Sequence, residues 1–169
     1  VGAVSYQLDV SRTINFVTTP ANWYVPGYEH RNVGNTLTEC LSGLAPGETY
    51  YYRVLAVGPD GASGNSATIS VTTTPDPPEV YAATNVTGRS FWANWARLSI
   101  ATNYLLDVAR DPAFTDYVSG YQNRSVGDVG TAFVTGLDLC TTYYVRLRMQ
   151  NEGGISGDSE TVGVTTAPE

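Results

Sequence analysis

The chain contains two copies of one unit. Gly27-Tyr28 returns 93 positions later as Gly120-Tyr121. The same offset relates Val33-Gly34 to Val126-Gly127, Gly43-Leu44 to Gly136-Leu137, Tyr50-Tyr51 to Tyr143-Tyr144, Arg53 to Arg146 and Pro75 to Pro168. Upstream, Tyr6 to Val10 matches Tyr104 to Val108 at an offset of 98, so the first copy carries five extra residues before Gly27. Such a repeat predicts two similar domains, which we place at residues 1–75 and 76–169.

Within each copy, the hydrophobic pattern has a period of two. Tyr50, Tyr52 and Val54 alternate with Tyr51 and Arg53, and the second copy repeats this alternation. Because successive side chains of a strand point to opposite faces, the pattern predicts strands with one face toward a core. Turn-forming clusters separate the runs: Ala45-Pro46-Gly47, Pro59-Asp60-Gly61 and Glu152-Gly153-Gly154. Many short strands at this spacing predict an all-β sandwich in each copy.

The second copy resembles a fibronectin type III repeat of the kind found in bacterial surface proteins. Ser90 to Trp95 is similar to the second strand of that family, and Trp95 to its core tryptophan. Leu137 with Tyr143 resembles the tyrosine corner, in which a phenol hydrogen-bonds to nearby backbone. The resemblance implies tandem immunoglobulin-like sandwiches in an extracellular or cell-surface protein.

The first copy departs from this pattern at its start. Only five residues precede Tyr6, whereas the second copy has two expected strands and Trp95 before Tyr104. The first copy should therefore lack its opening strands and present an open sheet edge and an uncovered apolar face. Two interpretations stay open: the chain is a piece of a longer repeat array, or another copy or partner supplies the strands.

Charge and hydropathy exclude several classes of partner. The net charge is −7, and all nine basic residues are arginines. An acidic surface argues against binding to nucleic acid. No run approaches the ~18 apolar residues of a membrane-spanning helix, so we expect no membrane span.

The residues for catalysis are sparse. His30 is the only histidine, which excludes triads and metal clusters built on several imidazoles. Asp9 and Asp107 match each other, and the alternation places both on the polar side of a strand. Asp60-Gly61 and Asp111-Pro112 read as turns. We therefore expect no catalytic residue, no metal, no cofactor and no enzymatic activity.

Four residues are candidates for contacts with partners. Cys40 and Cys140 occupy different positions of the repeat, so each domain has one cysteine and no disulfide within a domain can form. We expect Cys40 on a strand and Cys140 in the corner loop, either as free thiols or in an intermolecular disulfide. Trp23 and Tyr24 lie near the five-residue insertion and could contact a glycan or a protein; Trp23 could equally fold back over the sandwich.

These features predict a non-catalytic structural or adhesive segment of a bacterial extracellular surface protein or filament. Its expected partners are other copies of itself or neighbouring repeats, and a surface glycan or protein is a further candidate. The alternative is an accessory spacer or carbohydrate-binding module of a secreted polysaccharide-degrading enzyme.

Overall fold

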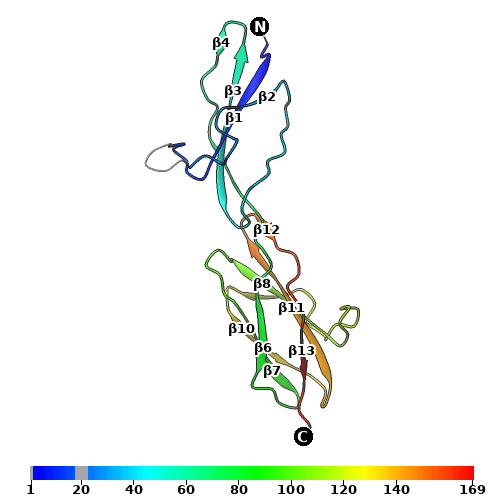
Figure 1. Cartoon of the computed structure of the whole chain (residues 1–169). Coiled ribbons are helices and arrows are strands. Elements are labelled where there is room, and N and C mark those ends of the chain that lie inside the picture. The colour runs from blue at the N-terminus through cyan, green and yellow to red at the C-terminus, as the bar shows by residue number, and fades with distance from the viewer. Residues whose placement is uncertain (1, 18–22) are drawn as a thin grey trace. The chain divides into compact units, whose positions relative to one another are not determined.

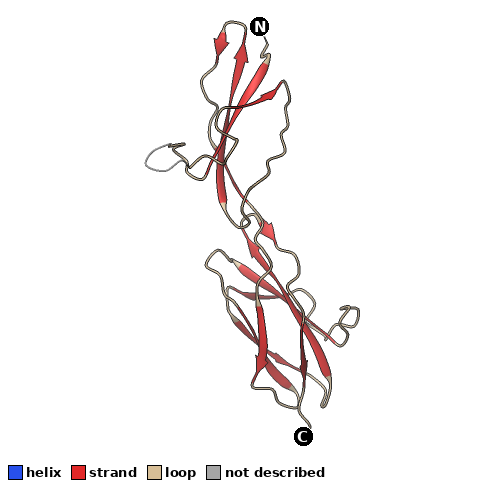
Figure 2. Cartoon of the chain, viewed as in Figure 1, coloured by secondary structure: helices blue, strands red, loops and turns tan. Residues whose placement is uncertain are grey.

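The computed structural model describes residues 2–17 and 23–169, and all its regular elements are strands (Figures 1 and 2). The chain divides into two units, Val1–Thr73 and Thr74–Glu169. None of the described residues form a helix with the length and hydrophobicity that crossing a membrane requires.

Unit 2 is a sandwich of two antiparallel sheets. The smaller sheet has the order β10 (Thr131–Thr135), β7 (Ser90–Trp95), β6 (Val80–Thr84). The larger sheet has the order β12 (Gly154–Ile155), β11 (Thr142–Asn151), β8 (Asn103–Ala109), β9 (Arg124–Gly127), with β13 (Val162–Thr165) also paired to β11.

The core of unit 2 forms where the inner faces of these sheets meet. Buried residues alternate along β7 and β11, as the period of two predicts. Phe91, Ala93 and Trp95 of β7 cover Tyr104 and other inner residues of the larger sheet. The ring centroids of Trp95 and Tyr104 lie 5.7 Å apart. The prediction that Trp95 is a core residue is therefore confirmed.

The described residues of unit 1 form a single sheet. Its order is β2 (Arg31–Gly34), β1 (Ser5–Ser11), β3 (Thr49–Gly58), β4 (Gly61–Ala62), with β5 (Ile69–Thr72) also paired to β3. The register of β1 on β3 repeats that of β8 on β11: Leu8 faces Val54 as Leu106 faces Leu147. Among the described residues of unit 1, no strand corresponds to β6, β7 or β10. The described part of the first unit thus lacks the opening strands.

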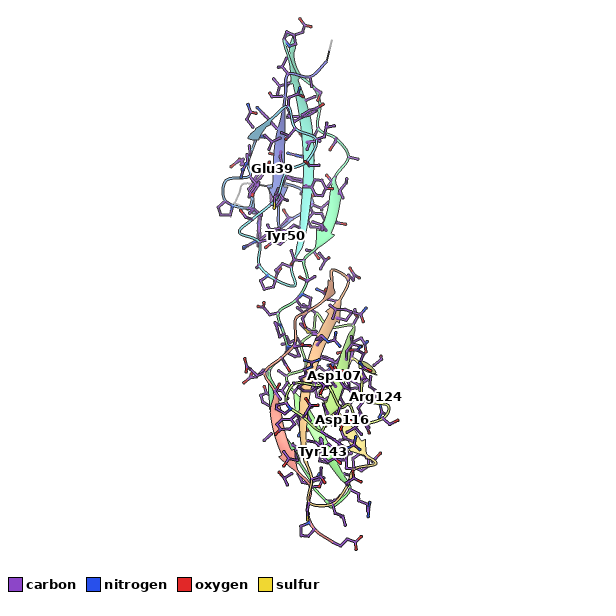
Figure 3. The ribbon with its side chains drawn as sticks, turned by 90° about the vertical axis from the view of Figure 1, so that its right-hand side faces the viewer. Glu39, Tyr50, Asp107, Asp116, Arg124 and Tyr143 are labelled. Carbon is purple, nitrogen blue, oxygen red and sulfur yellow. The ribbon has the colours of Figure 1, made fainter. Side chains whose placement is uncertain are left out.

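Both units close one end with a tyrosine corner. The hydroxyl of Tyr50 accepts a hydrogen bond from the Ala45 N–H at 2.8 Å, and that of Tyr143 accepts one from the Asp138 N–H at 2.8 Å. Figure 3 labels both tyrosines, which occupy equivalent places on β3 and β11. Each ring is fully buried, so the corner fixes the preceding loop to the sheet.

One expectation about the first unit is wrong. Cys40 lies in an irregular segment and not on a strand. Residues 38–42 correspond to β10, and β10 is a strand because β7 pairs with it along its whole length. Since the described part of unit 1 has no counterpart of β7, residues 38–42 have no ladder to join.

Trp95 gives a test of the assigned core. Trp95→Ala should lower the free energy of unfolding of unit 2 by about 3–5 kcal/mol, as for other large buried aromatic residues. The indole N–H of Trp95 has no hydrogen-bond partner among the described residues. Trp95→Phe, which removes this N–H and keeps most of the ring, should therefore cost markedly less. Hydrogen exchange of peptides from β8 and β11 in increasing urea measures both values, and equal losses would contradict the packing described.

Candidate interaction surface

Unit 1 has an apolar groove on the inner face of its sheet. Its volume is 490 Å³. The side chains that line it come from the sheet and from the segment after β2: Tyr6, Leu8, Val33, Thr36, Leu37, Thr38, Glu39, Leu41, Tyr52, Val54 and Val71. The exposed sheet face expected from the sequence is therefore present, and it is concave.

Unit 2 shows what the same face looks like when it is covered. Val54 is 37% exposed, whereas its counterpart Leu147 is 1% exposed. Val71 is 42% exposed, and its counterpart Val164 is 8% exposed. The residues remain apolar in unit 1 although water reaches them, and burial of such surface is worth ~25 cal/mol per Å². Covering the groove would therefore lower the free energy of unit 1.

One wall of the groove is formed by residues 36–42, here called the wall segment, which run beside the sheet without pairing to it. Leu41 packs against the core of unit 1. The Ser42 N–H donates a 3.0 Å hydrogen bond to the Tyr28 hydroxyl, which lowers the pKa of Tyr28. In unit 2, the Thr135 N–H at the end of β10 donates to the Tyr121 hydroxyl at 2.9 Å. The segment is thus anchored at the same point as a true strand of the smaller sheet.

The opposite, outer face of this sheet carries a buried ion pair. The Asp9 carboxylate accepts hydrogen bonds from the His30 backbone N–H at 2.7 Å and from Nε of Arg53 at 2.9 Å. The Arg53 guanidinium lies over the Phe16 ring, 4.1 Å from its centroid. Tyr24 is buried beside this group, and burial raises its pKa.

Unit 2 repeats the central contacts of this arrangement. Asp107 accepts from the Asn123 N–H at 2.6 Å and from Nε of Arg146 at 3.1 Å. The Arg146 guanidinium lies 4.0 Å from the centroid of the Phe114 ring and donates to the Tyr117 hydroxyl at 3.1 Å. His30 and Asn123 both have positive φ, at 50° and 53°. This backbone conformation suits asparagine better than most other residues.

These ion pairs correct the sequence-based view of the two aspartates. Asp9 and Asp107 were expected at polar, solvent-facing positions, but both are buried. Aromatic side chains that follow each strand, Phe16 and Tyr24 in unit 1 and their counterparts in unit 2, contact the paired arginines on the outer face. In each carboxylate, one oxygen accepts a backbone N–H and the other accepts the guanidinium Nε, so both aspartates join the loop to the neighbouring strand. Among the described residues, no group of histidine, cysteine or acidic side chains could hold a metal ion.

The two aromatic candidates for partner contacts, Trp23 and Tyr24, differ in their exposure to solvent. Trp23 is 41% exposed, and its carbonyl oxygen accepts hydrogen bonds from Arg12 N and the Ser11 hydroxyl. Tyr24 is buried and forms a β-bridge with Ser11, so little of its ring can meet a partner. Part of the insertion, residues 18–22, lies outside the described residues. A partner contact stays a prediction, and Trp23 is the better placed of the two.

Both cysteines are exposed free thiols in the structure. Cys40 lies in the wall segment of the groove, and Cys140 lies in the corner loop before β11 with a positive φ of 49°. Each is accessible to a second chain, and an intermolecular disulfide stays a prediction.

The ion pair of unit 2 gives a second test. Asp107→Ala should lower the free energy of unfolding of unit 2 by about 1–3 kcal/mol, because it removes the buried acceptor of both the Asn123 N–H and Nε of Arg146. Asp158→Ala removes a half-exposed carboxylate 3.0 Å from Arg146 and should cost less than about 1 kcal/mol. Urea unfolding followed by hydrogen exchange of β11 peptides compares the two. Equal costs would show that Asp107 is not the structural anchor.

Comparison with known proteins finds several relatives, one of which is named for its fibronectin type III domains. Human fibronectin type-III domain-containing protein 3A is 30% identical over 132 residues, which cover 77% of this chain and 11% of that protein. Human protein sidekick-1 is 29% identical over 157 residues, covering 81% of this chain and 7% of that protein. A Kelch domain-containing protein of Saccharolobus solfataricus is 37% identical over 81 residues, covering 44% of this chain and 10% of that protein. No protein-family model matches the chain.

The chain therefore spans only 7% to 11% of the length of these curated relatives. Among solved structures, the chicken CNTN1 FN1-FN3 domains align over 96% of this chain and 56% of that chain, with 16% identity and a TM-score of 0.43. The sheet order, the two tyrosine corners and the sequence relatives together assign both units to the fibronectin type III-like β-sandwich fold, the first without its opening strands.

Proposed function

We propose that the chain is a non-catalytic structural or adhesive repeat segment of a bacterial extracellular surface protein or filament. The observation that carries this proposal is the uncovered apolar face of unit 1. Its counterpart in unit 2 is core, and only association with another element can bury it. A chain of sandwich domains with such a face is suited to assembly.

The charge and the buried ion pairs support a structural role. The net charge of −7 disfavours nucleic acid and anionic lipid as partners. In the described part of the chain, the two most deeply buried carboxylates each accept hydrogen bonds from an arginine and from a backbone N–H, and so contribute to the fold. The natural partners we propose are other copies of the chain, neighbouring repeats, or a glycan or protein at the cell surface.

The alternative function is that of a spacer or carbohydrate-binding module in a secreted polysaccharide-degrading enzyme. Exposed Trp23 is the observation that favours it, because an indole ring on a loop can stack on a sugar. In that case the affinity for a polysaccharide should depend on Trp23 and not on the groove.

Location and binding distinguish these functions. Antibodies against the chain should label intact cells of a bacterium that encodes it, and electron microscopy should place the label on a surface layer or on filaments. Label confined to the cell interior would contradict the proposal. For the alternative, retention of the chain on insoluble cellulose, chitin or xylan, lost in Trp23→Ala, would favour the carbohydrate-binding module.

A separate prediction concerns the two units expressed alone. Residues 76–169 should fold, because the core of unit 2 lies between its own two sheets. Residues 1–75 should be unfolded or aggregated, since a few hundred Å² of uncovered apolar surface at ~25 cal/mol per Å² forgoes several kcal/mol, comparable with the stability of a small domain. Amide NMR spectra of both fragments provide the check. A well-dispersed spectrum from monomeric 1–75 would show that the sheet needs no cover.

A further inference from the structure

The outer face of the smaller sheet of unit 2, which we call the aromatic face, presents ring side chains to solvent. Tyr81 of β6 is 45% exposed, Phe133 of β10 is 47% exposed, and Trp92 of the central strand β7 is half-buried. Their neighbours Phe91 and Val134 point inward and are fully buried. The alternation along the strands therefore directs these three rings away from the core.

The ladders arrange the outward side chains in rows across the three strands. Each of two rows combines rings with amide or hydroxyl groups, and these rows are Tyr81, Asn94 and Thr131, followed by Thr84, Trp92 and Phe133. The Asn94 amide donates to Oγ1 of Thr84 at 3.2 Å, and its oxygen accepts a hydrogen bond from the Thr131 hydroxyl at 3.0 Å. These bonds hold the polar groups in fixed positions next to the rings.

The strands of the aromatic face are uncharged. β6, β7 and β10 contain no aspartate, glutamate, lysine or arginine. An acidic group lies at one end, where Glu79 precedes β6 and accepts a hydrogen bond from the Tyr81 hydroxyl at 3.3 Å. The whole chain carries a net charge of −7. An anionic ligand would therefore be repelled, whereas a neutral ligand meets no opposing charge.

The exposed rings are not a requirement of the repeat. Phe133 corresponds to Cys40 in unit 1, so this position of the fold accepts a small side chain. Trp92 packs against Phe133 at a centroid distance of 5.1 Å, and such a cross-strand pair stabilises a sheet. Tyr81 lies in the other row and does not belong to this pair. Sheet stability alone therefore does not account for all three rings.

The size of the aromatic face favours a small ligand over a protein. With ~3.4 Å per residue and ~4.8 Å between strands, three strands of five or six residues span about 17 by 14 Å. This area is far below the ~800 Å² that each partner contributes to a typical specific protein–protein interface. An apolar protein surface would also cover Asn94 and Thr131 without supplying hydrogen bonds to them, which costs free energy.

We propose that the aromatic face of unit 2 binds a neutral polysaccharide. The sugar rings of β-1,4-linked glucan, xylan and chitin carry C–H bonds on their faces and hydroxyl or amide groups at their edges. The C–H bonds suit the electron-rich faces of the aromatic rings, and the edge groups can hydrogen-bond to Asn94 and to the threonine hydroxyls. The inference rests on the proposed function, in which a glycan at the cell surface is a partner, and it names the class of glycan and its site.

Retention of the full chain on insoluble polysaccharides tests the site. The neutral probes are cellulose, chitin and β-1,4-xylan, and cross-linked polygalacturonate is the acidic comparison. We expect retention on at least one neutral material and none on polygalacturonate. Trp92→Ala should weaken this retention about tenfold, because it removes a stacking contact. Tyr81→Ala should weaken it as well, and it removes an exposed ring that lies outside the Trp92–Phe133 pair.

Matched variants separate stacking from folding. Phe133→Tyr keeps a ring and should retain the binding, whereas Phe133→Thr keeps a residue suited to strands and should weaken it. Ile155→Ala removes an exposed apolar side chain from the other sheet and should have no effect. Hydrogen exchange of β8 and β11 peptides checks that unit 2 is folded in each variant.

A fluorescence titration needs no change in the aromatic face. In a Trp23→Phe chain the remaining tryptophans are Trp92 and the buried Trp95. A soluble hexasaccharide of the retained polymer should therefore shift the tryptophan emission to shorter wavelength, because it removes water from Trp92. An unchanged emission at saturating hexasaccharide would contradict the proposed site.

The other outcomes that overturn the proposal are equally specific. Retention on none of the neutral polysaccharides would refute it, and so would retention that survives both Trp92→Ala and Tyr81→Ala. Loss of retention in Trp23→Ala alone would place the binding on unit 1. Surface label on intact cells without retention would make the polysaccharide site wrong and leave the proposed function standing. Retention by the aromatic face with label confined to the cell interior would support the site and contradict the proposed function.

Discussion

A β-sheet has two faces, and both larger sheets of this chain carry apolar or ion-paired residues on each of them. Burial of both faces is the constraint on which the rest of the structure depends, since a strand with Tyr6 and Leu8 on one side and Asp9 on the other needs two different covers. On the outer face, the cover is the loop that follows the first strand of the sheet. On the inner face, the cover must be a second sheet, and within the described residues only unit 2 has one.

The residues that cover the outer face follow the first strand closely in sequence, which explains why both units have them. Phe16 and Tyr24 lie within 15 residues of Asp9, and the loop that carries them is held by Arg53 from the neighbouring strand. A guanidinium in this position gains a charge-assisted hydrogen bond to the carboxylate and a cation–π contact with the ring. The Asp–Arg pair therefore replaces the apolar contacts that a third layer would provide.

The sequence was sufficient to predict the fold class, the repeat and the core position of Trp95, because these depend on alternation and on motifs that occur twice. It was misleading for Asp9 and Asp107, where alternation correctly placed the side chains on the outer face but could not show that a loop covers it. A signal was nevertheless present. Asp9 and Arg53, like Asp107 and Arg146, are opposite charges preserved in both copies, and they turn out to be direct cross-strand partners. Opposite charges that face each other across a ladder and recur at the repeat offset indicate an ion pair.

Cys40 illustrates a different limit. Whether residues 38–42 form a strand is decided by a partner strand far away in sequence, and local propensity cannot supply it. The tyrosine hydroxyl that anchors Ser42 is within the unit, however, so the segment keeps its place even without the ladder. Unit 1 thus retains the parts of the sandwich whose contacts are local: the outer cover, the tyrosine corner and the anchored wall segment. The part missing from its described residues is the one whose contacts come from strands distant in sequence, the second sheet over the inner face.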